Sequence, residues 1–195
     1  MLLAHLSGYS QGFRCSFAGE AVKPIAYQPD TEEEMELEEE IFDIGEDILE
    51  ELGISTDHYT WLAASNIRNF QAELNPRTRK VEISYNLTFI KNLYNRLSED
   101  DFEVVITVCL CHEIAHQLCG HTYGNGGTHQ SELAADLFAG KTIGRWASED
   151  EVDEEEALAM CLKAYKLIAH IGATPTHPGR AARIEAFTEG FEDQW

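Results

Sequence analysis

The sequence has few basic residues for its size. It holds 14 lysines and arginines against 35 aspartates and glutamates, which leaves a formal net charge of −21. A surface this acidic repels the phosphates of nucleic acids and of anionic lipids, so we expect neither as a partner. The same charge favours cationic or neutral substrates, although much of it comes from one local acidic run.

Long apolar runs are also absent. The longest, Val104 to Cys111 with Thr107 inside it, is far shorter than the roughly 20 residues that a membrane-spanning helix needs. The first residues, Met1 to Leu6, lack the basic region of a signal peptide. We therefore expect a soluble, cytoplasmic protein with no membrane span, or a periplasmic or secreted one if a signal segment has been removed.

Cysteines are few and odd in number: Cys15, Cys109, Cys111, Cys119 and Cys161. An odd count without a signal segment argues against a disulfide framework. Cys109 and Cys119 share a helical stripe with two histidines at 112 and 116, so a thiolate metal ligand is one alternative. Small buried apolar side chains are the preferred interpretation, and the sequence assigns no role to Cys109, Cys111 or Cys119.

Length and composition favour one domain. The chain has 195 residues, and 44% of them are hydrophobic, which is enough for a packed core. Residues 1–30 show no periodicity and are interrupted by glycine and proline, so we expect an N-terminal arm or loops there. The domain itself is predicted to cover residues 31–195.

Periodic apolar patterns predict a mostly helical α+β fold with a small antiparallel sheet. Helices are expected at 31–53, 86–97, 98–120, 130–146, 148–170 and 178–190, and strands at 60–75 and 80–85. Turn residues at 75–78 join two of the strands. Thr31, Ser98 and Ser148 are the predicted caps of three helices.

The most specific pattern is His112-Glu113-Ile114-Ala115-His116. Four residues make about one helical turn, so both imidazoles project from one face of the helix. That spacing suits two nitrogen ligands of a tetrahedral Zn²⁺ ion. Glu113 is turned about 100° from His112, where it could flank the ion and act as general base for a metal-bound water.

A catalytic zinc site needs a third protein ligand, and Glu132 is the best candidate. A glycine-containing loop precedes its helix and lets that helix cross the first one. Asp136 lies one turn further on the same face, where a carboxylate can fix the tautomer of a ligand imidazole. His121 is the rival ligand, but it would lie on the opposite side of the helix and is expected beside a ligand. His129 is a weaker rival.

A further candidate pair lies near the C-terminus, in Thr176-His177-Pro178 and Arg183. A histidine just before a proline that begins a helix is held stiffly. His177 could therefore donate a hydrogen bond to the oxyanion of a tetrahedral intermediate, with Arg183 supporting it. The alternative is an ordinary junction between a loop and a helix.

These motifs together resemble those of gluzincin peptidases related to HtpX and the CAAX prenyl proteases. The family's three motifs stand here as His112 to His116 with His121, as Glu132 to Asp136, and as His177-Pro178 with Arg183. The resemblance covers about residues 31 to 188.

The resemblance implies a zincin fold and a zinc-dependent endopeptidase acting on peptide or protein substrates. It implies zinc ligands at His112, His116 and Glu132, a base at Glu113, a supporting carboxylate at Asp136, and transition-state stabilisation by His177 and Arg183. The region from Val81 to Tyr85 resembles the edge strand on which such enzymes bind an extended peptide.

Two alternatives stay open. One is a non-catalytic module in which a structural zinc holds two helices for a partner protein, although such sites favour four protein ligands and do not need Glu113. The other is a latent peptidase whose N-terminal arm or C-terminal tail covers the cleft. The substrate and the oligomeric state do not follow from the sequence.

Overall fold

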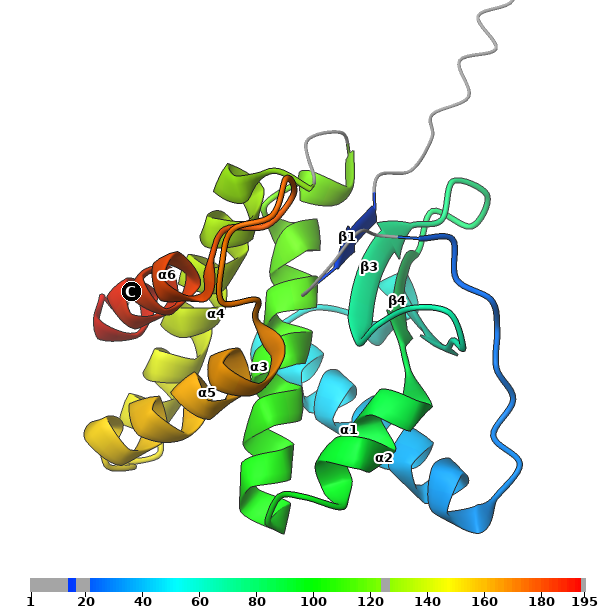
Figure 1. Cartoon of the computed structure of the whole chain (residues 1–195), viewed down its shortest axis with the longest axis horizontal. Coiled ribbons are helices and arrows are strands. Elements are labelled where there is room, and N and C mark those ends of the chain that lie inside the picture. The colour runs from blue at the N-terminus through cyan, green and yellow to red at the C-terminus, as the bar shows by residue number, and fades with distance from the viewer. Residues whose placement is uncertain (1–13, 17–21, 124–126, 194–195) are drawn as a thin grey trace, which may run out of the picture.

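The computed structural model describes residues 14–16, 22–123 and 127–193. They form an α+β fold in which helices gather on one side of a small sheet and below it (Figure 1). None of the helices in these ranges is long and apolar enough to cross a membrane.

The described elements follow one another in a simple order. They are β1 (Arg14–Ser16), α1 (Glu32–Glu51), η1 (Thr56–His58), β2 (Tyr59–Ala63), β3 (Phe70–Leu74), β4 (Val81–Tyr85), α2 (Leu87–Tyr94), α3 (Glu99–Leu118), η2 (His121–Tyr123), α4 (His129–Glu149), α5 (Glu154–Ile168) and α6 (Arg180–Glu192). All six predicted helices are present, with boundaries that differ by a few residues.

Side-chain caps explain where most helices begin. Thr31 and Ser98 accept hydrogen bonds from backbone N–H groups in the first turns of α1 and α3, as predicted. The predicted cap at Ser148 is wrong, because α4 continues through this residue to Glu149. Asp153 caps α5 instead, by accepting from the Glu156 N–H at 2.9 Å.

The sheet is mixed, with strand order β1-β3-β4-β2. β3 pairs antiparallel with β4, as expected for strands joined by the predicted turn, and also with β1, whereas β2 pairs parallel with β4. The predicted strand at Val81–Tyr85 is confirmed as β4, but its predicted place at the edge is wrong. It lies between β3 and β2, so its backbone groups are already engaged on both sides.

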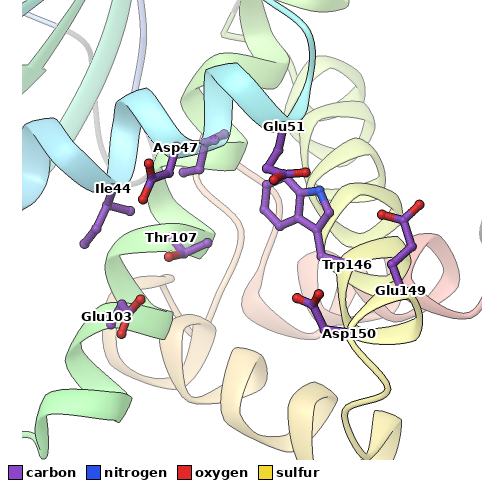
Figure 2. A pocket seen from close by; sticks show the side chains of 9 residues that line it. Ile44, Asp47, Glu51, Glu103, Thr107, Trp146, Glu149 and Asp150 are labelled. Atoms are coloured by element: carbon purple, nitrogen blue, oxygen red, sulfur yellow. The ribbon is translucent and has the colours of Figure 1, made fainter.

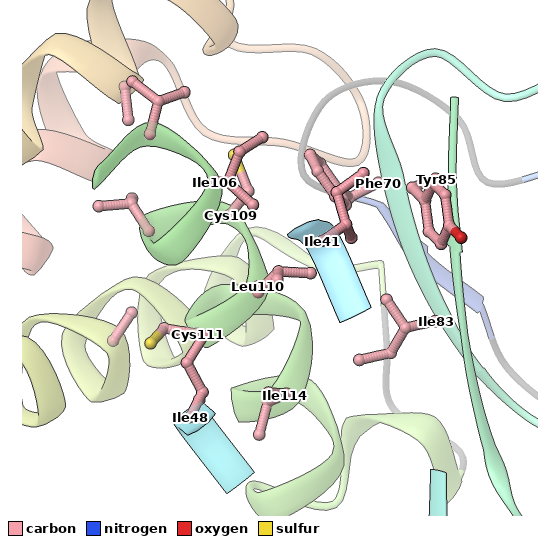
Figure 3. Packing of buried hydrophobic residues seen from close by; sticks show 14 of the residues in the cluster. Ile41, Ile48, Phe70, Ile83, Tyr85, Ile106, Cys109, Leu110, Cys111 and Ile114 are labelled. Carbon is pink, nitrogen blue, oxygen red and sulfur yellow. The ribbon is translucent and has the colours of Figure 1, made fainter. Parts of the chain in front are cut away.

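One core joins the sheet to α1 and α3. Figure 3 shows Ile41 of α1 between Leu110 of α3 and the sheet residues Phe70 and Ile83, and all four side chains are fully buried. Because α3 is surrounded, its C-terminal half is buried on nearly every side. Polar side chains on this half are therefore held rigidly and away from water.

Glycines allow α4 and α6 to cross at close range. A Cβ atom on Gly140 would lie 2.1 Å from the carbonyl oxygen of Phe187, and one on Gly190 would lie 2.1 Å from that of Leu137. Gly140 follows Asp136 by one turn on the same face of α4. The close crossing thus brings α6 to the side chain of Asp136.

Candidate metal centre

His112, His116 and Glu132, the three predicted metal ligands, come together where α3 meets α4. The Nε2 atoms of the two histidines are 3.0 Å apart. The carboxylate oxygens of Glu132 lie 3.3 Å from His112 Nε2 and 3.5 Å from His116 Nε2. All three side chains are fully buried, and together they could hold a metal ion.

The spacing of these atoms fits a tetrahedral ion. Metal–ligand bonds of about 2.0–2.1 Å place neighbouring ligand atoms roughly 3.3 Å apart, and the three observed distances bracket that value. Neither carboxylate oxygen of Glu132 accepts a hydrogen bond from a described residue, although both are buried. Burying a carboxylate in this way is costly, and a cation between Glu132 and the imidazoles would offset the cost.

Asp136 orients His112. Its Oδ1 atom lies 2.8 Å from His112 Nδ1, on the side of the ring away from Glu132. A carboxylate there fixes which ring nitrogen is protonated and directs Nε2 toward the position that a metal ion would take. Arg183 donates to both oxygens of Asp136, at 2.7 and 2.8 Å, and the Tyr165 hydroxyl donates at 2.9 Å.

Arg183 lies behind His112 in this network. Its guanidinium is 1% exposed, is paired with Asp136, and approaches His112 Nδ1 to 3.2 Å. These contacts suit a role in holding Asp136 and His112 in place. The direct contact with a transition state that the sequence suggested stays a prediction.

Tyr165 was missed by sequence analysis. Its spacing in α5 marks it as a core residue, and its ring is indeed buried against Phe187. Only the hydroxyl reaches Asp136, which helical periodicity cannot reveal.

The charges of this network follow from burial and pairing. Burial alone would lower the pKa of His112, but the Asp136 carboxylate raises it to about 9. Burial and the neighbouring His112 hold the pKa of His116 well below its usual value. Burial would raise the pKa of Asp136, but Arg183 and His112 bring it to about 2. Asp136 is therefore ionised at neutral pH, as a carboxylate that orients an imidazole must be.

His121 supports the second ligand. Its Nδ1 atom lies 2.9 Å from His116 Nδ1, on the ring edge away from His112 and Glu132. His121 thus lies where a group that orients His116 would lie. His129 has a different partner, because its Nε2 atom is 2.6 Å from the carbonyl oxygen of Thr174.

His177 also reaches the centre. It is 3% exposed, and its Nε2 atom lies 3.6 Å from Glu132 Oε2. The Thr176 hydroxyl is 2.8 Å from His177 Nδ1, which holds the ring on its other side. The loop before α6 therefore brings His177 to the ligand carboxylate.

The remaining candidates lie on α3 or at its end. Glu113 follows His112 and is fully buried. Cys109 and Cys111 are part of the apolar core, and Cys119 is exposed. Among the described residues, the group of possible metal ligands contains no cysteine.

Fold and site together define an α+β protein with a buried group of two histidines and a glutamate that could hold a metal ion. Residues 93–194, more than half of the 195-residue chain, match the family model described as Peptidase U49. The chain therefore belongs to this peptidase family, and peptides or proteins are its substrates. The matched region contains every candidate site residue. Comparisons with curated proteins and with solved structures gave no match.

Proposed function

We propose that this protein is a zinc-dependent endopeptidase of the gluzincin type, as its resemblance to the HtpX and CAAX protease motifs suggests. One observation carries the proposal: His112, His116 and Glu132 meet in a buried group with tetrahedral spacing, in a chain that belongs to a peptidase family. Two imidazoles and one carboxylate leave a fourth position for water or substrate, as catalytic zinc sites require.

In this mechanism His112, His116 and Glu132 would hold the ion, which would supply Lewis acidity toward the scissile carbonyl and make the attacking water more acidic. Glu113 accepts a proton from the attacking water and passes it to the leaving amine. His177 donates a hydrogen bond to the oxyanion of the tetrahedral intermediate. Asp136 keeps His112 oriented throughout.

The test is Glu113→Gln, with Glu103→Gln as the matched control because Glu103 is an exposed glutamate on the same helix. Metal analysis and digestion of a peptide library are measured on both variants. We expect both to bind one zinc ion, and only Glu113→Gln to lose hydrolysis, by roughly 10²–10⁴-fold as for removal of a general base. Undiminished cleavage by Glu113→Gln would reject the proposed base.

The same measurements address the non-catalytic alternative. A wild-type protein that binds zinc but cleaves no peptide in the library would favour a structural zinc that holds α3 and α4 together. The cytoplasmic location and the division into an arm and a domain at residue 31 stay predictions.

A further inference from the structure

β1 fills the outer edge of β3. Cys15 is paired with Ala72 in an antiparallel register, while the other edge of β3 is taken by β4. β1 also contacts α3 and η2. Figure 1 shows β1 beside α3. Because η2 carries His121, which contacts His116, this edge of the sheet runs beside the candidate metal centre.

Two carboxamide side chains hold the next described stretch of the chain by its backbone. The Gln71 amide accepts from the Val22 N–H at 2.9 Å and donates to the Val22 carbonyl oxygen at 2.8 Å. The Asn66 amide accepts from the Ile25 N–H at 2.7 Å and donates to the Lys23 carbonyl oxygen at 2.8 Å. All four contacts are made to main-chain atoms, so they would accept almost any sequence.

The stretch at residues 22–25 also borders the loop that leads to His177. A hollow of about 470 Å³ lies between them, lined by Val22 and Asn66 on one side and by Thr174, Pro175 and Thr176 on the other. Gln71 is 1% exposed, so its amide is fixed in place. The edge of β3 and the two amides thus make a path for an extended chain that passes the metal centre.

We propose that the outer edge of β3, with the amides of Gln71 and Asn66, is a binding site for an extended peptide backbone. The chain's own residues 14–16 and 22–25 occupy this site until a substrate strand displaces them. The inference rests on the proposed peptidase function, and it names the sheet edge where a substrate adds as a strand. It also gives the latent-peptidase alternative a structural basis, because substrate must compete with a segment of the same chain.

The size of the segment makes displacement feasible. β1 has three residues, and each backbone hydrogen bond contributes only about 0.5–1.5 kcal/mol net. A substrate that pairs over more of β3 would therefore compete effectively. A covalent link that prevents release of β1 would not allow such competition.

The register of β1 on β3 shows where such a covalent link can be introduced. Paired residues in antiparallel strands have Cα atoms roughly 4.5–5.5 Å apart, within the range that a disulfide can bridge. Ala72→Cys therefore places a second cysteine opposite Cys15. All proteins in the test carry Cys119→Ser, because Cys119 is an exposed thiol. The matched control adds Cys15→Ser to Ala72→Cys, which leaves no partner for the new cysteine.

We expect oxidation of the Ala72→Cys protein to consume two thiols and to slow peptide hydrolysis roughly tenfold or more, the equivalent of one or two lost backbone hydrogen bonds. Reductant should restore the rate, and zinc content should not change. The hydrolysis rate of the control should change on neither oxidation nor reduction. Equal rates for oxidised and reduced protein would overturn the proposal, as would failure of the disulfide to form.

A binding measurement separates this proposal from the peptidase function. A fluorescent peptide with the sequence of residues 11–25 is titrated into the same full-length variants carrying Glu113→Gln, and its anisotropy is followed. Tighter binding to the reduced than to the oxidised form supports the backbone site, even if no variant hydrolyses peptides. Equal binding to both forms overturns it, whatever the hydrolysis assays give.

Discussion

The two ends of the α3–α4 pair carry similar side chains in opposite environments. At one end Glu113, Glu132 and Asp136 are fully buried. At the other end acids of the same helices are exposed around a hollow of about 320 Å³ (Figure 2). The hollow is lined by Asp47 and Glu51 of α1, Glu103 of α3, Trp146 and Glu149 of α4, and Asp150 just after α4, among nine residues of which none is basic.

The difference shows that burial and pairing, more than the number of carboxylates, distinguish a functional site. Asp136 is fixed by Arg183 and Tyr165, and it fixes His112 in turn. The acids of the hollow are exposed to water, which screens their charges, and the 3.7 Å ion pair that Glu149 forms with Arg145 is itself partly exposed. Much of the net charge of −21 is of this solvated kind, so charge alone does not indicate a ligand.

The strongest test of the comparison replaces one glutamate at each end of α4. Glu132→Gln should weaken zinc binding by more than the roughly 10–100-fold typical of changes to supporting residues, because it removes a ligand. It should also raise the melting temperature of the metal-free protein, since the amide removes a buried charge. Glu149→Gln should change neither. Calorimetric titration with zinc and thermal melts in chelator provide the measurements.

Replacing Arg183 tests how much the stability of the buried end depends on the pairing of Asp136. Arg183→Met leaves Asp136 buried without its counter-charge and should lower the free energy of unfolding by about 3–5 kcal/mol. Adding Asp136→Asn should recover part of this loss, because the uncompensated charge is then gone. Urea unfolding of the single and double variants measures the coupling. Strictly additive losses would mean that the two side chains act independently.

Gly140 tests the crossing that brings Arg183 to Asp136. Gly140→Ala forces a Cβ atom against the backbone of α6 and should cost about 1–3 kcal/mol. Zinc affinity should fall as well, because α6 moves away from Asp136. Gly172→Ala is the control, since a Cβ atom there meets nothing within 4 Å. Similar unfolding midpoints for the two variants would mean that the close contact between α4 and α6 at Gly140 does not contribute to stability.

The pH dependence of stability should also report the pairing of Asp136 with Arg183 at the buried end. The pKa of Asp136 is lowered from 3.8 to about 2, chiefly by Arg183 acting against the effect of burial. Its contribution to stability is therefore fully present above pH 3.8 and is lost as pH falls toward 2. In chelator, the melting temperature of wild type should fall more steeply over this window than that of Arg183→Met. Parallel curves would contradict this assignment.

Local pattern was enough to predict the three side chains that meet in the candidate metal centre. His112 and His116 are one turn apart, and Glu132 and Asp136 lie on one face of the next helix, so each pair could be found from spacing alone. The helix starts at Thr31 and Ser98 were predictable for the same reason, because a capping bond joins near neighbours in sequence.

What could not be predicted depends on contacts between distant segments. Periodicity does not reveal that β2 runs parallel to β4, that β1 joins the sheet, or that Gln71 holds Val22. One signal was present and was not used: Gly140 and Gly144 are one turn apart on the face of α4 that carries Asp136, a spacing that favours close helix packing.

The smallest expected effect lies at the exposed end. Replacing Glu103 by Gln and Asp150 by Asn removes two like charges that face the hollow, so the protein should become more stable by a few tenths of a kcal/mol. The gain should vanish in about 1 M salt, where the screening length falls to roughly 3 Å. Zinc affinity should stay unchanged, because these acids are at the far end of both helices. A marked loss of stability or of zinc binding would instead mean that the hollow is an organised site, and the contrast between buried and exposed acids would fail.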